Sequence, residues 1–181
     1  MSLEQAIAFM TNAPVLLLDM RVAHKCLTMQ VQEELEAGHN PVGTWKPKGS
    51  FFFTLMKMPN GLYVYSHDTE RLYIASNNMR IAHSCPDNVA FLGHFFLENG
   101  VPRFLVFDLV EYNFDSVEAR YNRLRDLARF LPQPVCMLQW VGDLGSLRQE
   151  FLVTLPHQVD YLFSMVCSNP CIVHKITLPQ P

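Results

Sequence analysis

Runs of apolar positions separated by short turn sequences in the middle of the chain predict β-strands joined by tight turns. Residues 50–57 (SFFFTLMK) and 62–67 (LYVYSH) flank Pro59-Asn60-Gly61, a turn sequence because Asn-Gly tolerates positive φ. Residues 103–110 (RFLVFDLV) are almost continuously apolar, which predicts a strand covered on both faces. Short apolar runs predict further strands at residues 15–22, 72–76, 89–97, 135–141, 159–166 and 172–178.

Apolar residues at helical spacing predict a few helices beside these strands. Residues 2–12 form a short amphipathic segment, and residues 24–38 form a second one that ends in glycine, a suitable C-cap. Residues 116–131 carry the clearest helical pattern, with Ser116 as N-cap and with their arginines expected to face solvent. A shorter helix is predicted at residues 145–154. Many hairpin strands with few helices predict an α+β fold with mainly antiparallel sheets.

Length and composition indicate one globular domain. The chain has 181 residues, of which 49% are hydrophobic and 17% are charged, whereas a disordered chain would be less apolar and more charged. It shows no internal repeat and no low-complexity linker. We therefore expect a single domain at residues 1–181, with a helical N-terminal lead-in at 1–43 and the core at 44–178.

Charge and cysteine content narrow the expected partners and location. A net charge of −3 argues against the broad basic surface that duplex DNA binders use, so duplex DNA is excluded as a partner, although a small basic pocket is allowed. No apolar run is long enough for a membrane span, so no membrane partner is expected. Five cysteines without a CxxC pair predict reduced thiols and a cytoplasmic or nuclear location. Cys167, Cys171 and His174 lack a second pair at zinc spacing, so neither a metal nor a cofactor is predicted.

Four segments between about residue 44 and residue 166 resemble, in order, motifs of the mRNA capping enzyme and DNA/RNA ligase superfamily. Residues 46–51 (KPKGSF) resemble the family's K-x-D-G-x-R, and residues 92–96 (LGHFF) resemble its L-D-G-E-L. Residues 104–108 (FLVFD) resemble the following strand that ends in Asp, and residues 158–163 (QVDYLF) resemble E-x-D-G-L-I-F. The resemblance implies a nucleotidyltransferase-like core.

The departures from these motifs imply that most of the family's catalytic groups are missing. In active members the motif lysine attacks the α-phosphate of a nucleotide, with a divalent metal held by carboxylates. This chain keeps that lysine as Lys46 but has no clear L-x-K-x-K motif, for which residues 174–176 (HKI) are a poor match. In the first motif, Lys48 replaces the family's Asp and Phe51 replaces its Arg. Phe95 replaces the metal-handling Glu of L-D-G-E-L. In the last motif, E-x-D-G-L-I-F, Gln158 replaces the Glu and Tyr161 replaces the Gly. In this loss of catalysis the chain resembles the cap-binding domain of snurportin.

The resemblance also supplies candidate ligand contacts, each of which has a purely structural alternative. The two tryptophans would stack on a guanine base or belong to the core. The two aspartates would accept from the guanine edge or anchor a structural hydrogen bond, and the lysines would contact phosphate or be solvated. The histidine would contact the ligand or be satisfied by a neighbour. The candidates are Trp45, Lys46, Lys48, His94, Asp108, Trp140 and Asp160.

We accordingly predict a non-catalytic module that binds an RNA cap or a guanine nucleotide. Its expected partners are capped RNA or a guanine nucleotide, with another protein subunit left open. One alternative is an active nucleotidyltransferase that uses Lys46 as its nucleophile. Another is a protein-interaction domain that keeps only the scaffold.

Overall fold

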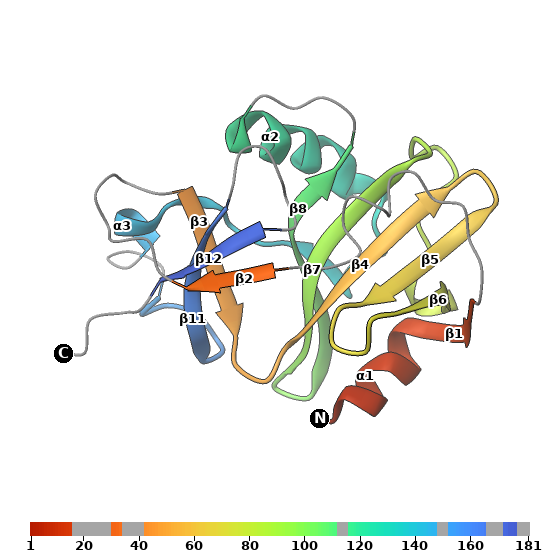
Figure 1. The fold of residues 1–181 in the computed structure, drawn as a ribbon, viewed down its shortest axis with the longest axis horizontal. Coiled ribbons are helices and arrows are strands. Elements are labelled where there is room, and N and C mark those ends of the chain that lie inside the picture. Colours follow the sequence, from red (N-terminus) through yellow and green to blue (C-terminus); the bar gives the residue numbers. More distant parts are fainter. Residues whose placement is uncertain (16–29, 34–41, 112–115, 148–151, 166–171, 177–181) are drawn as a thin grey trace.

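The computed structural model describes residues 1–15, 30–33, 42–111, 116–147, 152–165 and 172–176, and it contains two β-sheets (Figure 1). The larger sheet has the order β1-β6-β5-β4-β7-β8-β9, and the smaller has the order β10-β3-β11-β12-β2. All neighbouring strands are antiparallel except β8 with β9 and β12 with β2. This confirms the predicted α+β fold with mainly antiparallel sheets.

The strand bounds agree with most of the predicted strands. In the seven-stranded sheet they are β1 (Thr11–Pro14), β4 (Phe51–Met58), β5 (Gly61–Ser66), β6 (Arg71–Ala75), β7 (Val89–Glu98), β8 (Val101–Val110) and β9 (Cys136–Leu138). In the five-stranded sheet they are β2 (Gln30–Glu33), β3 (Val42–Pro47), β10 (Gly142–Asp143), β11 (Val159–Met165) and β12 (Ile172–Ile176). The helices are α1 (Leu3–Met10), α2 (Val117–Leu127) and α3 (Leu144–Ser146), with 3₁₀ turns η2 (Asn77–Met79) and η3 (Ala128–Phe130).

Local sequence explains where several of these elements begin. The Ser2 side chain accepts from the backbone N–H of Gln5 while the Gln5 side chain accepts from the N–H of Ser2, a capping box that starts α1. Ser116 caps α2 by accepting from the N–H of Ala119. The predicted double coverage of β8 is confirmed, because its residues from Phe104 to the end of the strand are all buried.

The N-terminal part differs from the expected helical lead-in. Segment 1–43 contains one described helix, α1, but also two strands. β1 belongs to the larger sheet and β2 belongs to the smaller one. The helix predicted at 24–38 is wrong at residues 30–33, which form β2 and pair with β12. A local amphipathic pattern cannot reveal this pairing, because the partner strand lies far away in the sequence. The strand predicted at 15–22 falls almost entirely outside the described residues.

The two sheets pack face to face, and α1 covers the other face of the larger sheet. On β7, His94 and Phe95 point to opposite faces because side chains alternate along a strand. The His94 ring lies 5.7 Å from Phe163 of β11, whereas Phe95 stacks on Phe9 of α1 at 5.1 Å. In Figure 1 the smaller sheet and α1 accordingly lie on different sides of β7. A second, small core lies around β3 and contains Trp45, Leu144, Leu147, Leu162 and Ile176.

Candidate functional site

Aromatic rings fill the space between the two sheets around His94. Its imidazole stacks on Phe107 at 4.7 Å and lies 4.4 Å from Phe52. Phe163 of the smaller sheet closes this cluster by packing edge-on against Phe107 at 5.1 Å. A base that stacked at this depth would have to displace these rings, so a ligand is more easily held where the sheets meet solvent.

His94 is neutral and fully buried. The amide nitrogen of Gln139 donates to the hydroxyl of Thr44 and to the carbonyl of Trp45, which leaves the amide oxygen of Gln139 to face His94 Nδ1 at 3.4 Å. His94 Nδ1 is therefore the protonated nitrogen, and Nε2 has no hydrogen-bond partner among the described residues. Burial lowers the pKa of His94 well below 6.5.

Two lysines flank Tyr161 at the solvent end of the contact between the sheets. Lys46 Nζ lies 5.9 Å from the centres of both the Tyr161 and Phe52 rings and 3.4 Å from Asp160 Oδ2. Lys175 Nζ lies 4.8 Å from the centre of the Tyr161 ring. The Lys46 side chain is 13% exposed, whereas that of Asp160 is 50% exposed. These five residues, Lys46, Phe52, Asp160, Tyr161 and Lys175, are called the Lys46 site below.

Strand pairing brings the Lys46 site together. Lys46 of β3 is directly opposite Tyr161 of β11, while β12 on the other side of β11 carries Lys175. Burial, and to a smaller extent the charges of Asp160 and Asp68, raise the pKa of Tyr161 to about 12. The phenol is therefore protonated at neutral pH and is a potential hydrogen-bond donor.

Asp68 is a second carboxylate near this site. Partial burial raises its pKa, and a backbone hydrogen bond from Phe52 and the positive charge of Lys46 oppose that rise. Sequence reasoning missed Asp68 because it stands in a polar turn between β5 and β6, where an aspartate is ordinary. Lys175 was noticed only as part of a poor motif match, although its place on β12 puts it beside Tyr161.

The structure does not bring Asp108 to the Lys46 site. Asp108 is buried and accepts two hydrogen bonds from Arg120 of α2, from Nε at 2.8 Å and from Nη2 at 3.0 Å. The expectation that the arginines of this helix face solvent is wrong for Arg120, which is 3% exposed. A carboxylate in an apolar strand needs a partner, and here α2 supplies it.

Neither tryptophan lies at the Lys46 site. Trp45 belongs to the small core, on the opposite face of β3 from Lys46, and its indole Nε1 donates to His157 Nε2 at 2.9 Å. Trp140 packs half-buried against the same small core. The predicted stacking of a guanine between these two rings therefore has no support in their positions.

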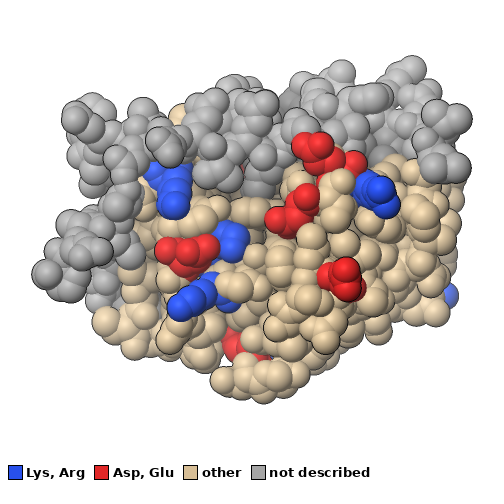
Figure 2. Space-filling view, turned by 60° about the horizontal axis from the view of Figure 1, so that its bottom comes forward, with Lys and Arg blue, Asp and Glu red and all other residues tan. Residues whose placement is uncertain are grey.

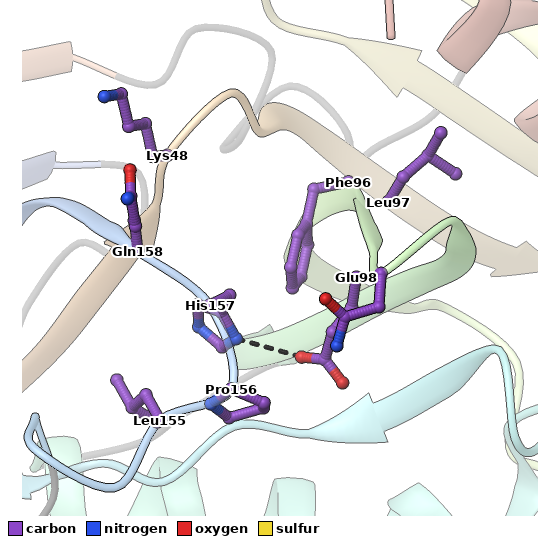
Figure 3. Close-up of a pocket in the computed structure, with 9 residues that line it drawn as sticks. Lys48, Phe96, Leu97, Glu98, Leu155, Pro156, His157 and Gln158 are labelled. Atoms are coloured by element: carbon purple, nitrogen blue, oxygen red, sulfur yellow. Dashed lines mark hydrogen bonds and ion pairs between the residues drawn. The ribbon is translucent and has the colours of Figure 1, made fainter.

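Lys48 lines a separate pocket of about 480 Å³ (Figure 3). Lys48 and Gln158 form one end of it, and His157 lies between them and Glu98. His157 Nε2 accepts from Trp45, so Nδ1 carries the proton and donates to Glu98 Oε2 at 2.9 Å. With both nitrogens engaged, this histidine is a structural bridge rather than a free base.

Of two catalytic glutamate positions implied by the resemblance, one is a core residue and the other is an exposed residue of the Lys48 pocket. Phe95, at the position of the metal-handling glutamate, is buried and packs between Phe9 and Phe53. Gln158, at the late glutamate position, is exposed in the Lys48 pocket. Within the described residues, no group of three His, Cys, Asp or Glu side chains is arranged to hold a metal ion.

Comparison with known proteins supports the fold and goes no further. No protein-family model matches the chain, and no curated protein is detectably similar to it in sequence. The structure is similar to that of a Lig E DNA ligase, from a study of DNA binding with a minimal scaffold, with a TM-score of 0.50 and 13% identity. The match covers 90% of this chain and 70% of the ligase chain. The fold is therefore nucleotidyltransferase-like, and the particular likeness to snurportin is not supported.

The exclusion of duplex DNA was wrong. It was deduced from the net charge of −3, yet the similar fold of the Lig E ligase belongs to a protein described as binding DNA. Net charge is a property of the whole chain, whereas contacts with phosphates depend on a few local cations.

No described helix is long and apolar enough to cross a membrane.

Proposed function

We propose that this chain is a nucleotidyltransferase-fold domain that binds a phosphate-bearing nucleotide at the Lys46 site without transferring it. The observation that carries the proposal is the pair of ammonium groups, Lys46 and Lys175, on either side of Tyr161. Ammonium groups bind phosphate through charge-assisted hydrogen bonds, and the half-buried rings of Tyr161 and Phe52 offer apolar surface to a base.

Lys46 lies near two carboxylates, Asp160 and Asp68, but its ion pair with Asp160 is loose, which supports binding of an anion. Its ion-pair partner, Asp160, is half exposed and lies at 3.4 Å, a long distance for such a pair, so a phosphate can compete for the ammonium group. On the described part of the face in Figure 2, basic and acidic side chains are interspersed and form no continuous basic stripe. We therefore expect a few local phosphate contacts and a shallow salt dependence.

The absence of transfer is inferred from the residues around the lysine. The position of the metal-handling glutamate is Phe95 in the core, and Lys48 replaces the motif aspartate. Recognition of guanine or an RNA cap is the narrower form of the proposal. In that form, Asp160 would accept hydrogen bonds from the edge of the guanine base, because Asp108 is already paired with Arg120.

Fluorescence anisotropy with labelled nucleotides tests the binding proposal. The panel contains ATP, GTP, a methylated cap analogue, and 5′-phosphorylated DNA as a single strand and as a duplex. Lys46→Ala and Lys175→Ala should each weaken binding tenfold or more, because a hydrogen bond to a charged group contributes about 1.5–3 kcal/mol. Lys57→Ala is the matched control, because Lys57 is also a partly buried strand lysine but pairs with Asp87 at 2.6 Å. Absence of binding at millimolar concentration, or equal losses in all three variants, would refute the proposal.

A second candidate function, an active nucleotidyltransferase, is favoured by one observation. Asp160 and Asp68 both lie near Lys46, and Mg²⁺ is often held by one or two carboxylates together with substrate phosphates. Incubation with α-labelled nucleotides and Mg²⁺ or Mn²⁺ would then give a covalent adduct that Lys46→Ala abolishes. Reversible binding without an adduct, with any of the four nucleotides, supports the non-catalytic function instead.

A further inference from the structure

A second pocket, of about 430 Å³, is lined by residues 80–83 and 129–132. It shares no residue with the Lys46 site or with the Lys48 pocket. Its first segment follows η2, which contacts α1, and its second segment is η3 with the residues after it. The volume is in the range of sites that hold small organic ligands.

The pocket presents basic groups and no acidic one. Arg80, His83 and Arg129 line it, all three are exposed, and none of the eight lining residues is Asp or Glu. Within the described part of the chain, neither arginine forms an ion pair. Five other lysines and arginines of the described residues do pair with carboxylates, namely Lys46, Lys57, Arg103, Arg120 and Arg123. In a chain of net charge −3, two unpaired guanidinium groups at one pocket form a local excess of positive charge.

The two sides of the pocket are held at a fixed spacing. The N–H of Ala82 donates to the carbonyl of Phe130 at 3.0 Å, which joins the loop to η3. Ile81 and Leu131 are buried in the main core on either side of this bond. The guanidinium of Arg129 lies over the Phe130 ring, 4.6 Å from its centre, which restricts its orientation. The basic groups are therefore displayed by an ordered backbone.

We propose that this pocket binds a phosphate group, with Arg80 and Arg129 as the principal contacts and His83 as a third donor. Guanidinium groups suit this ligand because their planar N–H donors match two phosphate oxygens at once. A free mononucleotide and a nucleic acid strand are both sources of this phosphate, since both present the same oxygens. The inference is independent of the Lys46 site.

Titration followed by ¹⁵N–¹H NMR tests the proposal with three probes: pyrophosphate, AMP and a short single-stranded DNA. We expect the amide signals of residues 80–83 and 129–132 to shift. The double variant Arg80→Gln/Arg129→Gln should weaken binding at least tenfold while Lys46→Ala leaves these shifts intact. Stronger binding of DNA than of AMP would identify a strand as the source of the phosphate, and the reverse would identify a mononucleotide.

Arg125→Gln is the matched control. Arg125 lies one helical turn before Arg129, also covers an aromatic ring, Tyr121 at 5.2 Å, but does not line the pocket. Its replacement should change affinity less than twofold. An equal loss in Arg125→Gln would indicate general electrostatic attraction and would overturn the proposal. So would the absence of shifts at the pocket with all three probes at millimolar concentration. The three substituted arginines are exposed, and thermal unfolding of each variant checks that it is folded.

Discussion

Replacement of Asp108 by alanine tests whether this carboxylate stabilises the fold or contacts a ligand, as the resemblance implied. Asp108 is 1% exposed and accepts from Arg120 Nε and Nη2 and from the backbone N–H of Leu109 at 2.8 Å. The substitution removes the carboxylate that accepts two hydrogen bonds from the Arg120 guanidinium, a group that is 3% exposed. Removing one partner of a buried pair typically costs about 3–5 kcal/mol, so we expect the free energy of unfolding to fall by that amount.

Urea denaturation followed by circular dichroism measures this loss. Glu111→Ala is the control, because Glu111 pairs with Arg123 in a similar bidentate arrangement at side chains that are 22% and 36% exposed. Its expected cost is less than about 1 kcal/mol. The double variant Asp108→Leu/Arg120→Met should recover most of the lost stability, because it removes both charges from the core. The reasoning is refuted if Asp108→Ala costs no more than the control, or if the folded variant loses nucleotide binding.

Three further predictions concern stability and the assignment of the site. Lowering the pH from 6.5 towards about 4 should destabilise the fold. Burial lowers the pKa of His67 to about 4 and that of His94 well below 6.5, so the unfolded chain binds more protons than the folded chain in this pH interval. Midpoints of urea unfolding at about pH 7 and pH 5 measure the loss of stability. The variant His67→Gln should show a smaller loss. Gly43→Ala should lower stability by about 2–4 kcal/mol in thermal unfolding, because the added Cβ would overlap the carbonyl oxygen of Phe163; an unchanged midpoint would contradict the close β3–β11 pairing. Trp45→Phe should lower the free energy of unfolding by about 1 kcal/mol, because it loses the hydrogen bond to His157, and should leave nucleotide affinity unchanged. A tenfold loss of affinity would instead indicate that Trp45 contacts the ligand.

The hairpins and the main helix could be predicted because their signals are local. Apolar runs on either side of the Asn-Gly turn define β4 and β5, and a helical stripe with a serine cap defines α2. β3 was missed because Gly43, Lys46 and Pro47 weaken any strand pattern, and its formation depends on pairing with β11, more than 100 residues later. Where distant pairing decides the structure, a local pattern carries little information.

The site was harder to predict than the fold for a related reason. Alternation shows that Trp45 and Lys46 point to opposite faces, but it does not say which face meets the larger sheet. Likewise, an aspartate in an apolar strand fits either a ligand site or a buried ion pair. Arg120 decides between them for Asp108, and its position becomes known only when α2 is placed on β8.

The aromatic filling between the sheets has a kinetic consequence. With His94, Phe107 and Phe163 in contact, a ligand at the Lys46 site need not wait for the sheets to separate. Association should then be a single diffusional step, and few contacts at an open site should give a short residence time. Bound and free forms would exchange rapidly on the NMR timescale. Such a domain would respond to the current nucleotide concentration rather than store the ligand.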